Sequence, residues 1–164
     1  MGYLVTNKNN IMQKISVIGL GNDILGDDAI GLIAVRELKE VFGSAIDVYE
    51  SPNGGLELLD YLEGYDKALI LDSLFTGEYP VGSIVEYSSS DFEISSASTP
   101  HYIGLPEVVK LAEKLNISIP KDIRILLIEV ENPYEVTTII TKIVKAKAKH
   151  LINRAAEIVK ILAI

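Results

Sequence analysis

Residues 19–31 read GLGNDILGDDAIG, and they join a short apolar run to a helical pattern. A glycine-rich turn between a strand and a helix is commonly a phosphate site, because backbone N–H groups and the helix macrodipole face the anion. Here the turn ends in two adjacent carboxylates, Asp27 and Asp28, which suit the positive end of the macrodipole but repel a phosphate. The turn therefore predicts a site for a hard or borderline cation at the start of a helix.

Composition narrows the class of protein. The chain has 164 residues, enough for one domain with a core, and 48% of them are apolar. A formal net charge of −8 argues against general nucleic-acid binding, which needs a basic surface. The absence of cysteine excludes disulfides, thiolate metal sites and a cysteine nucleophile.

We expect a polar N-terminal tail over residues 1–13 and a single α/β domain over residues 14–164. The tail has no apolar core, so it is not interpreted as a signal peptide. No apolar run approaches the roughly 20 residues that span a bilayer. The expectation is a cytoplasmic protein without membrane contact, and a monomer, because no exposed apolar stripe is evident.

Strands are expected at 14–20, 45–50, 67–72, 82–87 and 122–129, alternating with helices at 29–42, 55–62, 103–115 and from about Tyr134 onward. The third and fifth strands are near-continuous apolar runs, which is typical of parallel strands buried on both faces. The pattern predicts a three-layer α/β sandwich with a mostly parallel, twisted, five-stranded sheet and helices on both faces.

The fourth strand follows the third after only a short Thr76-Gly77-Glu78 connection. A parallel crossover needs about a dozen residues or more, so this pair of strands is expected to be antiparallel. The fourth strand is therefore predicted to lie at an edge of the sheet.

Candidate chemistry gathers at the strand ends, because ligands of open α/β sheets bind at the carboxyl ends of parallel strands. The first strand leads to Asp28, and the third ends at Asp72. A long serine-rich stretch over residues 91–100 delivers His101. Two carboxylates and an imidazole suit nickel, zinc, manganese and iron alike.

Each of these residues also has a purely structural interpretation. Asp27 or Asp28 could simply cap a helix, and Asp27 is the better candidate because it lies further from the helix body. Asp72 could bond loop N–H groups, and His101 could be an ordinary loop histidine. The second histidine, His150, lies in a basic helix that is interpreted as a solvated face, with binding of an acidic partner as the alternative.

Two further features leave alternatives open. The run Asn53-Gly54-Gly55 is either a turn before a helix or a place where another backbone approaches closely, as in a peptide-binding crevice. Gly19 and Gly21, with Glu50 at the end of the second strand, partly match a dinucleotide-binding fingerprint, but its third glycine is replaced by Ile24.

An ordered set of motifs resembles the [NiFe]-hydrogenase maturation endopeptidases over roughly residues 14–160. The segment in which Gly19, Gly21 and Asn22 precede Asp27-Asp28 and Gly31 resembles the N-terminal signature of that family. The later segments are, in order, Asn53-Gly54-Gly55-Leu56-Glu57-Leu58-Leu59, Leu71-Asp72-Ser73, Thr99-Pro100-His101-Tyr102-Ile103-Gly104-Leu105 and Glu129-Val130-Glu131.

The resemblance implies an endopeptidase that removes the C-terminal extension of a hydrogenase large-subunit precursor after nickel insertion. Carried over by position, the two acids and one histidine that contact nickel, and serve as catalytic residues, are Asp28, Asp72 and His101. The first acid is glutamate in some members of the family. The substrate-binding residues are then expected to be Gly21, Asn22, Asn53, Gly54 and Gly55, although Ser51-Pro52-Asn53 departs from the family's commonest form.

Nickel would be carried by the substrate, and another divalent cation could replace it in the isolated protein. Docking that depends on the loaded metal gives specificity by differential binding. Water attack in the docked crevice is the expected chemistry, with the metal or one of the two carboxylates activating the water. Two alternatives stay open: a nickel metallochaperone without peptidase activity, and a Rossmann-like nucleotide-binding module.

Overall fold

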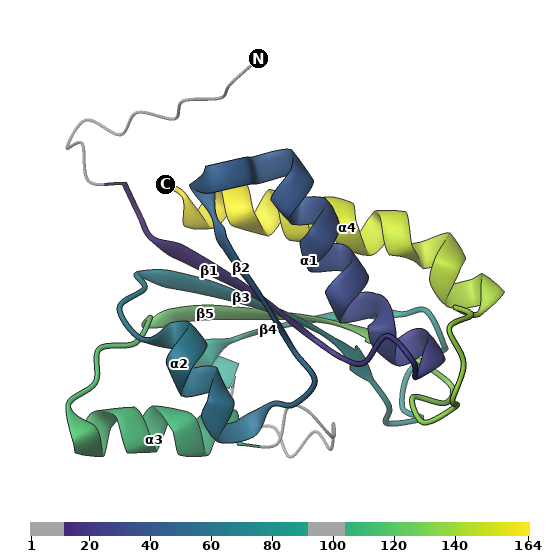
Figure 1. Cartoon of the computed structure of the whole chain (residues 1–164), viewed down its shortest axis with the longest axis horizontal. Helices are drawn as coiled ribbons and strands as arrows, with labels where there is room; N and C mark the ends of the chain where they lie inside the picture. Colours follow the sequence, from purple (N-terminus) through teal and green to yellow (C-terminus); the bar gives the residue numbers. More distant parts are fainter. Residues whose placement is uncertain (1–11, 92–103) are drawn as a thin grey trace.

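The computed structural model describes residues 12–91 and 104–164, which form one twisted five-stranded sheet between two layers of helices (Figure 1). The strand order is β2-β1-β3-β5-β4, with β4 antiparallel to β5 and every other neighbouring pair parallel. The predicted fold class is confirmed. The strands are β1 Ile15–Leu20, β2 Asp47–Ser51, β3 Lys67–Leu74, β4 Ile84–Ser88 and β5 Asp122–Glu129.

Helices α1 and α4 cover one face of the sheet, and α2 and α3 cover the other (Figure 1). Strand alternation divides the core between them: on β3, Leu69 and Leu71 pack under α1 and α4, whereas Ala68 and Ile70 pack under α2 and α3. The helices are α1 Ile30–Phe42, α2 Leu58–Leu62, α3 Leu105–Leu115 and α4 Lys142–Leu162, with short 3₁₀ turns η1 Gly26–Ala29, η2 Gly43–Ala45, η3 Gly55–Glu57 and η4 Ser89–Asp91.

Strand β4 lies at the edge and runs antiparallel, as predicted, but its hydrogen-bonded neighbour is β5 and not β3. The connection between β3 and β4 crosses the end of β5 and is held there by the buried carboxylate of Glu129. That carboxylate accepts hydrogen bonds from the backbone N–H groups of Thr76 and Gly77 at 2.9 and 2.8 Å and from the Thr76 hydroxyl at 2.9 Å. The predicted direction of β4 is thus confirmed, whereas the prediction that β4 pairs with β3 was wrong.

The last helix begins at Lys142, so the predicted start near Tyr134 was wrong. Residues 133–141 form instead an irregular strap, defined here as the segment from Pro133 to Thr141. It begins with a turn and pairs with the chain near Leu25 through a parallel bridge at Thr137. The β-branched run from Val136 to Thr141 favours extended backbone. Thr141 then provides the N-cap of α4, its side chain accepting from the Val144 N–H.

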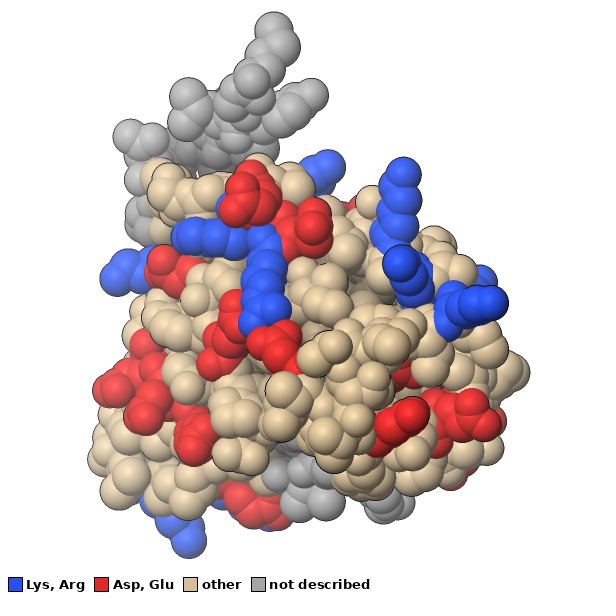
Figure 2. Space-filling view, turned by 45° about the vertical axis from the view of Figure 1, so that its right-hand side comes forward, with Lys and Arg blue, Asp and Glu red and all other residues tan. Residues whose placement is uncertain are grey.

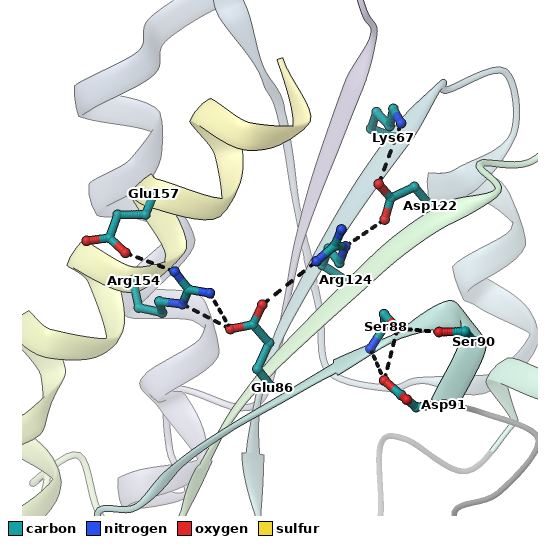
Figure 3. Close-up of polar contacts among 9 residues, drawn as sticks. All are labelled: Lys67, Glu86, Ser88, Ser90, Asp91, Asp122, Arg124, Arg154 and Glu157. Carbon is teal, nitrogen blue, oxygen red and sulfur yellow. Dashed lines mark hydrogen bonds and ion pairs between the residues drawn. The ribbon is translucent and has the colours of Figure 1, made fainter. Parts of the chain in front are cut away.

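A chain of alternating charges crosses the sheet beside α4 (Figure 3). It runs Lys67–Asp122–Arg124–Glu86–Arg154–Glu157, and so connects β3, β5, β4 and α4. Each pair is partly exposed and contributes little alone. Glu86, the charged residue of β4, also helps to keep this edge strand from pairing with another chain.

Three glycines allow α1 to begin directly against the sheet. A Cβ on Gly31 would lie 2.3 Å from the Leu20 carbonyl oxygen and 2.6 Å from that of Leu71, while a Cβ on Gly19 would lie 2.6 Å from the Gly31 oxygen. A Cβ on Gly21 would lie 2.0 Å from the Asp28 oxygen, and Gly21 has a φ of +146°. These glycines thus set how closely the turn that carries Asp28 approaches β1 and β3.

The same geometry predicts the cost of a single methyl group. Gly31→Ala should lower the free energy of unfolding by about 3 kcal/mol or more, because backbone atoms on two strands would have to move. Gly43→Ala is the matched control: Gly43 has a φ of +54° and nothing within 4 Å, so we expect a loss of only about 1 kcal/mol. Urea denaturation of both variants measures the difference, and equal losses would contradict the close-packing account.

No helix among residues 12–91 and 104–164 combines the length and the apolar character needed to traverse a lipid bilayer.

Candidate functional site

Asp28 and Asp72 come together at the carboxyl end of the sheet, as predicted. Asp28 lies in η1, the turn between β1 and α1, and Asp72 lies near the end of β3. Both side chains are buried, each about 1% exposed. The two carboxylates are near enough for the charge on Asp28 to act on the titration of Asp72. Two acids far apart in the sequence therefore share one buried location.

Burial raises the pKa of the Asp72 carboxyl well above its usual range, because the charged form loses its hydration. The neighbouring Asp28 carboxylate raises this pKa further, and the hydrogen bond from the Ser73 N–H to Asp72 Oδ1, at 2.7 Å, lowers it. The balance is a carboxyl that resists ionisation. A cation placed between the two acids would reverse that balance.

Ser73 joins the two acids and was not assigned a role from the sequence. Its backbone N–H donates to Asp72, and its hydroxyl donates to Asp28 Oδ1 at 2.8 Å. Successive residues of a strand point to opposite faces, so Asp72 lies on the α2 and α3 side while Ser73 lies on the α1 side, where η1 enters. Strand alternation could have revealed this role from the sequence. A small hydroxyl residue directly after the acid at the strand end must face the helix layer that holds Asp28.

Asp27 has a structural role, but the interpretation that it caps the helix following it was wrong: α1 has Ala29 as its N-cap and no side-chain cap bond. Its carboxylate accepts hydrogen bonds from the Thr141 N–H at 2.7 Å and from the Thr141 hydroxyl at 2.8 Å. It thereby anchors the start of α4 and not the helix that follows it in the sequence. The two adjacent aspartates diverge, one into the site and one onto the strap.

Gly21 and Asn22, expected to bind substrate, both have hydrogen bonds within the protein, Gly21 to the end of β2 and Asn22 within the turn. The Gly21 N–H donates to the Ser51 carbonyl oxygen at 3.1 Å, and Asn22 Oδ1 accepts from the Ile24 N–H at 3.1 Å. These bonds fix the shape of the turn above β1. Contact of either residue with a substrate remains a prediction.

The segment Asn53-Gly54-Gly55 meets a closely approaching backbone, but that backbone belongs to the chain itself. A Cβ on Gly104, the N-cap of α3, would lie 2.8 Å from the Gly55 Cα. The segment is also fixed by Ser51, whose hydroxyl donates to the Asn53 carbonyl oxygen at 2.7 Å. The start of α3 is thus packed against this segment on the same face of the sheet as Asp72, and substrate contact here stays a prediction.

His101, the third residue of the predicted metal-contacting set, lies outside the described residues. Within residues 12–91 and 104–164, no three side chains from Asp, Glu, His and Cys gather as a metal site would require. What the described part of the chain provides is the pair of acids from η1 and β3.

Glu50, the acid that would bind ribose in a dinucleotide site, is bound to Arg36. The guanidinium donates to the Glu50 carboxylate and, through both terminal nitrogens, to Asp23 at 2.8 and 2.9 Å. The pairing of Glu50 with Arg36 argues against the nucleotide-binding alternative.

Comparison with known proteins now gives the class. The profile of the hydrogenase maturation protease family matches residues 32–158. This stretch includes Asp72 and His101, and begins just after Asp28. The chain belongs to the hydrogenase maturation protease family, as the resemblance implied, and that family is one of peptidases.

Two characterised relatives are similar over part of their length. One is the hydrogenase 2 maturation protease of Escherichia coli, 25% identical over 101 residues that cover 59% of this chain and 62% of the relative. The other is the hydrogenase expression/formation protein HupD of Bradyrhizobium diazoefficiens, 25% identical over 107 residues that cover 63% and 56%. The matched stretch thus spans less than two thirds of each relative.

Solved structures share the fold. The hydrogenase maturating endopeptidase HybD from Escherichia coli superposes with a TM-score of 0.77 at 21% identity, covering 90% of this chain and 92% of that one. The [NiFe] hydrogenase maturation protease HybD from Thermococcus kodakarensis superposes with a TM-score of 0.71 at 23% identity, covering 89% and 99%. At these identities the likeness concerns the arrangement of the backbone.

Burial of two like charges should reduce stability, which yields a test. Because the Asp72 pKa is raised on folding, the folded state binds more protons than the unfolded state, and stability falls as pH rises through that interval. Asp72→Asn should therefore raise the Tm at pH 7 by a few degrees, with the gain shrinking toward pH 4. Calorimetry across this pH range measures the effect, with the exposed Asp60→Asn as control. A lower Tm for Asp72→Asn at pH 7 would contradict the electrostatic account.

Asp27 and Asp28 should respond oppositely to the same substitution. Asp27→Asn weakens two hydrogen bonds to Thr141 and should cost about 1–3 kcal/mol of stability. Asp28→Asn keeps a carbonyl oxygen to accept from Ser73 and removes one buried charge, so stability should be retained or increased. Chemical denaturation of both variants separates them, and an unchanged stability for Asp27→Asn would exclude its anchoring role.

Proposed function

We propose that this protein is an endopeptidase that removes the C-terminal extension of a [NiFe]-hydrogenase large-subunit precursor after nickel insertion. In this proposal Asp28, Asp72 and His101 recognise the nickel bound to the precursor. Family membership supports the peptidase class and the hydrogenase precursor as the kind of substrate. The reaction is expected in the cytoplasm.

The buried pair Asp28 and Asp72 is the observation that carries the proposal. Each acid is about 1% exposed, and the charge of one opposes ionisation of the other. Two buried carboxylates at the carboxyl end of a parallel sheet are costly unless a cation compensates them. Carboxylate and imidazole are suitable ligands for nickel, and nickel held by precursor thiolates can accept further ligands. The acids are therefore suited to sensing a metal that arrives with the substrate.

Ser73 would position the pair for this task. Its hydroxyl and its backbone N–H each hold one oxygen of one acid, so the two carboxylates are oriented before a metal binds. Such preorganisation reduces the conformational cost of recognition. A precursor without nickel would offer these two buried acids no metal to contact, which provides a physical basis for favouring the loaded form.

Cleavage would require an activated water. In the proposal either the metal or one of the two carboxylates polarises or deprotonates that water. Of the two acids, Asp72 has the environment that favours the protonated form, which suits proton exchange during amide hydrolysis. The chain has no cysteine, so a cysteine nucleophile plays no part.

A metallochaperone that binds nickel through the same three residues but cuts nothing is the principal alternative. It would use the same acid pair, so only an activity measurement separates the two functions. The nucleotide-binding module is not favoured, because the Glu50 carboxylate accepts hydrogen bonds from the Arg36 guanidinium.

The test compares the two histidines of the chain. His101→Ala should reduce processing of a nickel-loaded precursor by at least about 100-fold, because it removes a nickel contact. His150→Ala, on the exposed surface of α4, is the matched control and should process the precursor at the wild-type rate. Intact mass spectrometry of the precursor measures loss of the C-terminal peptide over time.

Two results of the same assay would contradict the proposal. Processing by His101→Ala at the wild-type rate would exclude its proposed role. Nickel binding by the wild-type protein without cleavage of any candidate precursor would favour the metallochaperone.

A further inference from the structure

The strap between β5 and α4 exposes a concentration of large apolar side chains. Tyr134, Val136 and Ile139 are 59%, 78% and 75% exposed. The strap is nevertheless fixed to the body of the protein: the Gly26 N–H donates to the Thr137 oxygen at 2.7 Å, and the Thr137 N–H donates to the Ile24 oxygen at 3.0 Å. These apolar groups are therefore displayed by an ordered segment.

Residues from two other loops lie against the strap and add to its apolar surface. Ile24, 56% exposed, lies in the turn after β1 and is paired with the strap through its backbone. Phe75, directly after β3, meets the Tyr134 ring edge-on with centroids 6.1 Å apart. Single exposed apolar residues are common, but a contiguous group of them marks a binding surface. The apolar strap surface is defined here as Ile24, Phe75, Tyr134, Val136 and Ile139.

A lysine face begins where the strap ends. Lys142, Lys145 and Lys149 are three and four residues apart, so they lie on one side of α4, and all three are exposed. None of them forms an ion pair with any described residue, and no acidic residue occurs between residues 136 and 156. This lysine face is unusual in a chain of net charge −8. Figure 2 shows basic side chains gathered at the upper right of that view, with uncharged surface between them and the acidic groups below.

Local stability does not explain these lysines. Cations in the first turn of a helix oppose the macrodipole, and the first turn of α4 contains no acid. Like charges three or four residues apart repel one another. Each effect costs a few tenths of a kcal/mol or more, whereas an acid at the same place would stabilise the helix. An arrangement that is locally unfavourable and solvent-facing is better accounted for by an external acidic partner.

We propose that the apolar strap surface and the lysine face together dock the folded body of the hydrogenase large-subunit precursor, through an acidic patch that borders apolar residues. This inference rests on the proposed function. The strap is fixed to the turn that carries the acids, because Asp27 accepts two hydrogen bonds from Thr141 and is the sequence neighbour of Asp28 in η1. A precursor docked on the strap would therefore be held at a fixed position relative to the acids, and the lysines select a partner of opposite charge.

The experiment uses the triple variant Lys142→Glu, Lys145→Glu and Lys149→Glu. Its matched control carries the same changes at Lys110, Lys114 and Lys121, which are exposed on α3 and before β5, on the opposite face of the sheet. Steady-state cleavage of a nickel-loaded precursor is followed by intact mass at about 50 mM and 300 mM salt. The α4 variant should lose at least about 10-fold in kcat/KM at low salt through a higher KM with kcat unchanged, and its salt dependence should flatten.

A second variant separates the apolar part from the charged part. Val136→Ser with Ile139→Ser should also raise KM at least about fivefold, without changing the salt dependence. Thermal unfolding controls for folding, and the α4 triple variant should be at least as stable as the wild type, since acids now lie in the first turns of the helix.

The outcomes distinguish this inference from the function on which it rests. Wild-type cleavage with equal KM for the α4 variant, the α3 control and the wild type would overturn the docking surface alone. Failure of the wild type to cleave any candidate precursor would overturn the proposed function and the docking surface with it. Binding of the wild type, but not the α4 variant, to vesicles containing about 30% phosphatidylserine, with cleavage unaffected, would assign the lysines to a membrane and overturn the proposal.

Discussion

The close approach of η1 and α1 to the sheet determines where the two buried acids, Asp28 and Asp72, lie. Gly19, Gly21 and Gly31 leave out the Cβ atoms that would otherwise contact carbonyl groups at distances of 2.0 to 2.6 Å. The approach brings the turn over the ends of β1 and β3. Asp28 is thereby inserted beside Asp72, where Ser73 bonds to both acids. The glycines of this turn therefore act through packing, although glycines at such a place commonly receive a phosphate.

The adjacent aspartates separate two tasks that the site requires. Asp28 contributes a buried negative charge beside Asp72, and a pair of buried acids suits a cation. Asp27 is also buried, but its carboxylate accepts two hydrogen bonds from Thr141, the N-cap residue of α4. Through this bond the strap and the lysine face are fixed at a constant position relative to the acids. In the proposed function, recognition of the metal and recognition of the protein that carries it would both depend on this one short turn.

Much of this arrangement could be predicted from the sequence, because apolar periodicity and strand ends are local signals. The run from Asp122 to Glu129 gave β5 its observed bounds, and the carboxyl-end rule brought Asp28 and Asp72 together. The start of α4 was misplaced, because Val136 and Ile139 continue its apolar spacing although both are exposed. The insertion of β5 between β3 and β4 depends on Glu129 holding a distant loop, and such long-range bonds leave no periodic trace. The role of Ser73 likewise depends on what lies across the sheet.

In the proposed function, cleavage at the acid pair requires nickel that is bound to the substrate. The most direct measurement is the intact mass of a large-subunit precursor after incubation with this protein, performed in parallel with nickel-loaded and nickel-free precursor. The account predicts loss of a C-terminal peptide from the loaded precursor only, and retention of the full mass by the nickel-free precursor. Equal cleavage of both forms would contradict recognition of the metal, and the pair of buried acids would then need a different explanation.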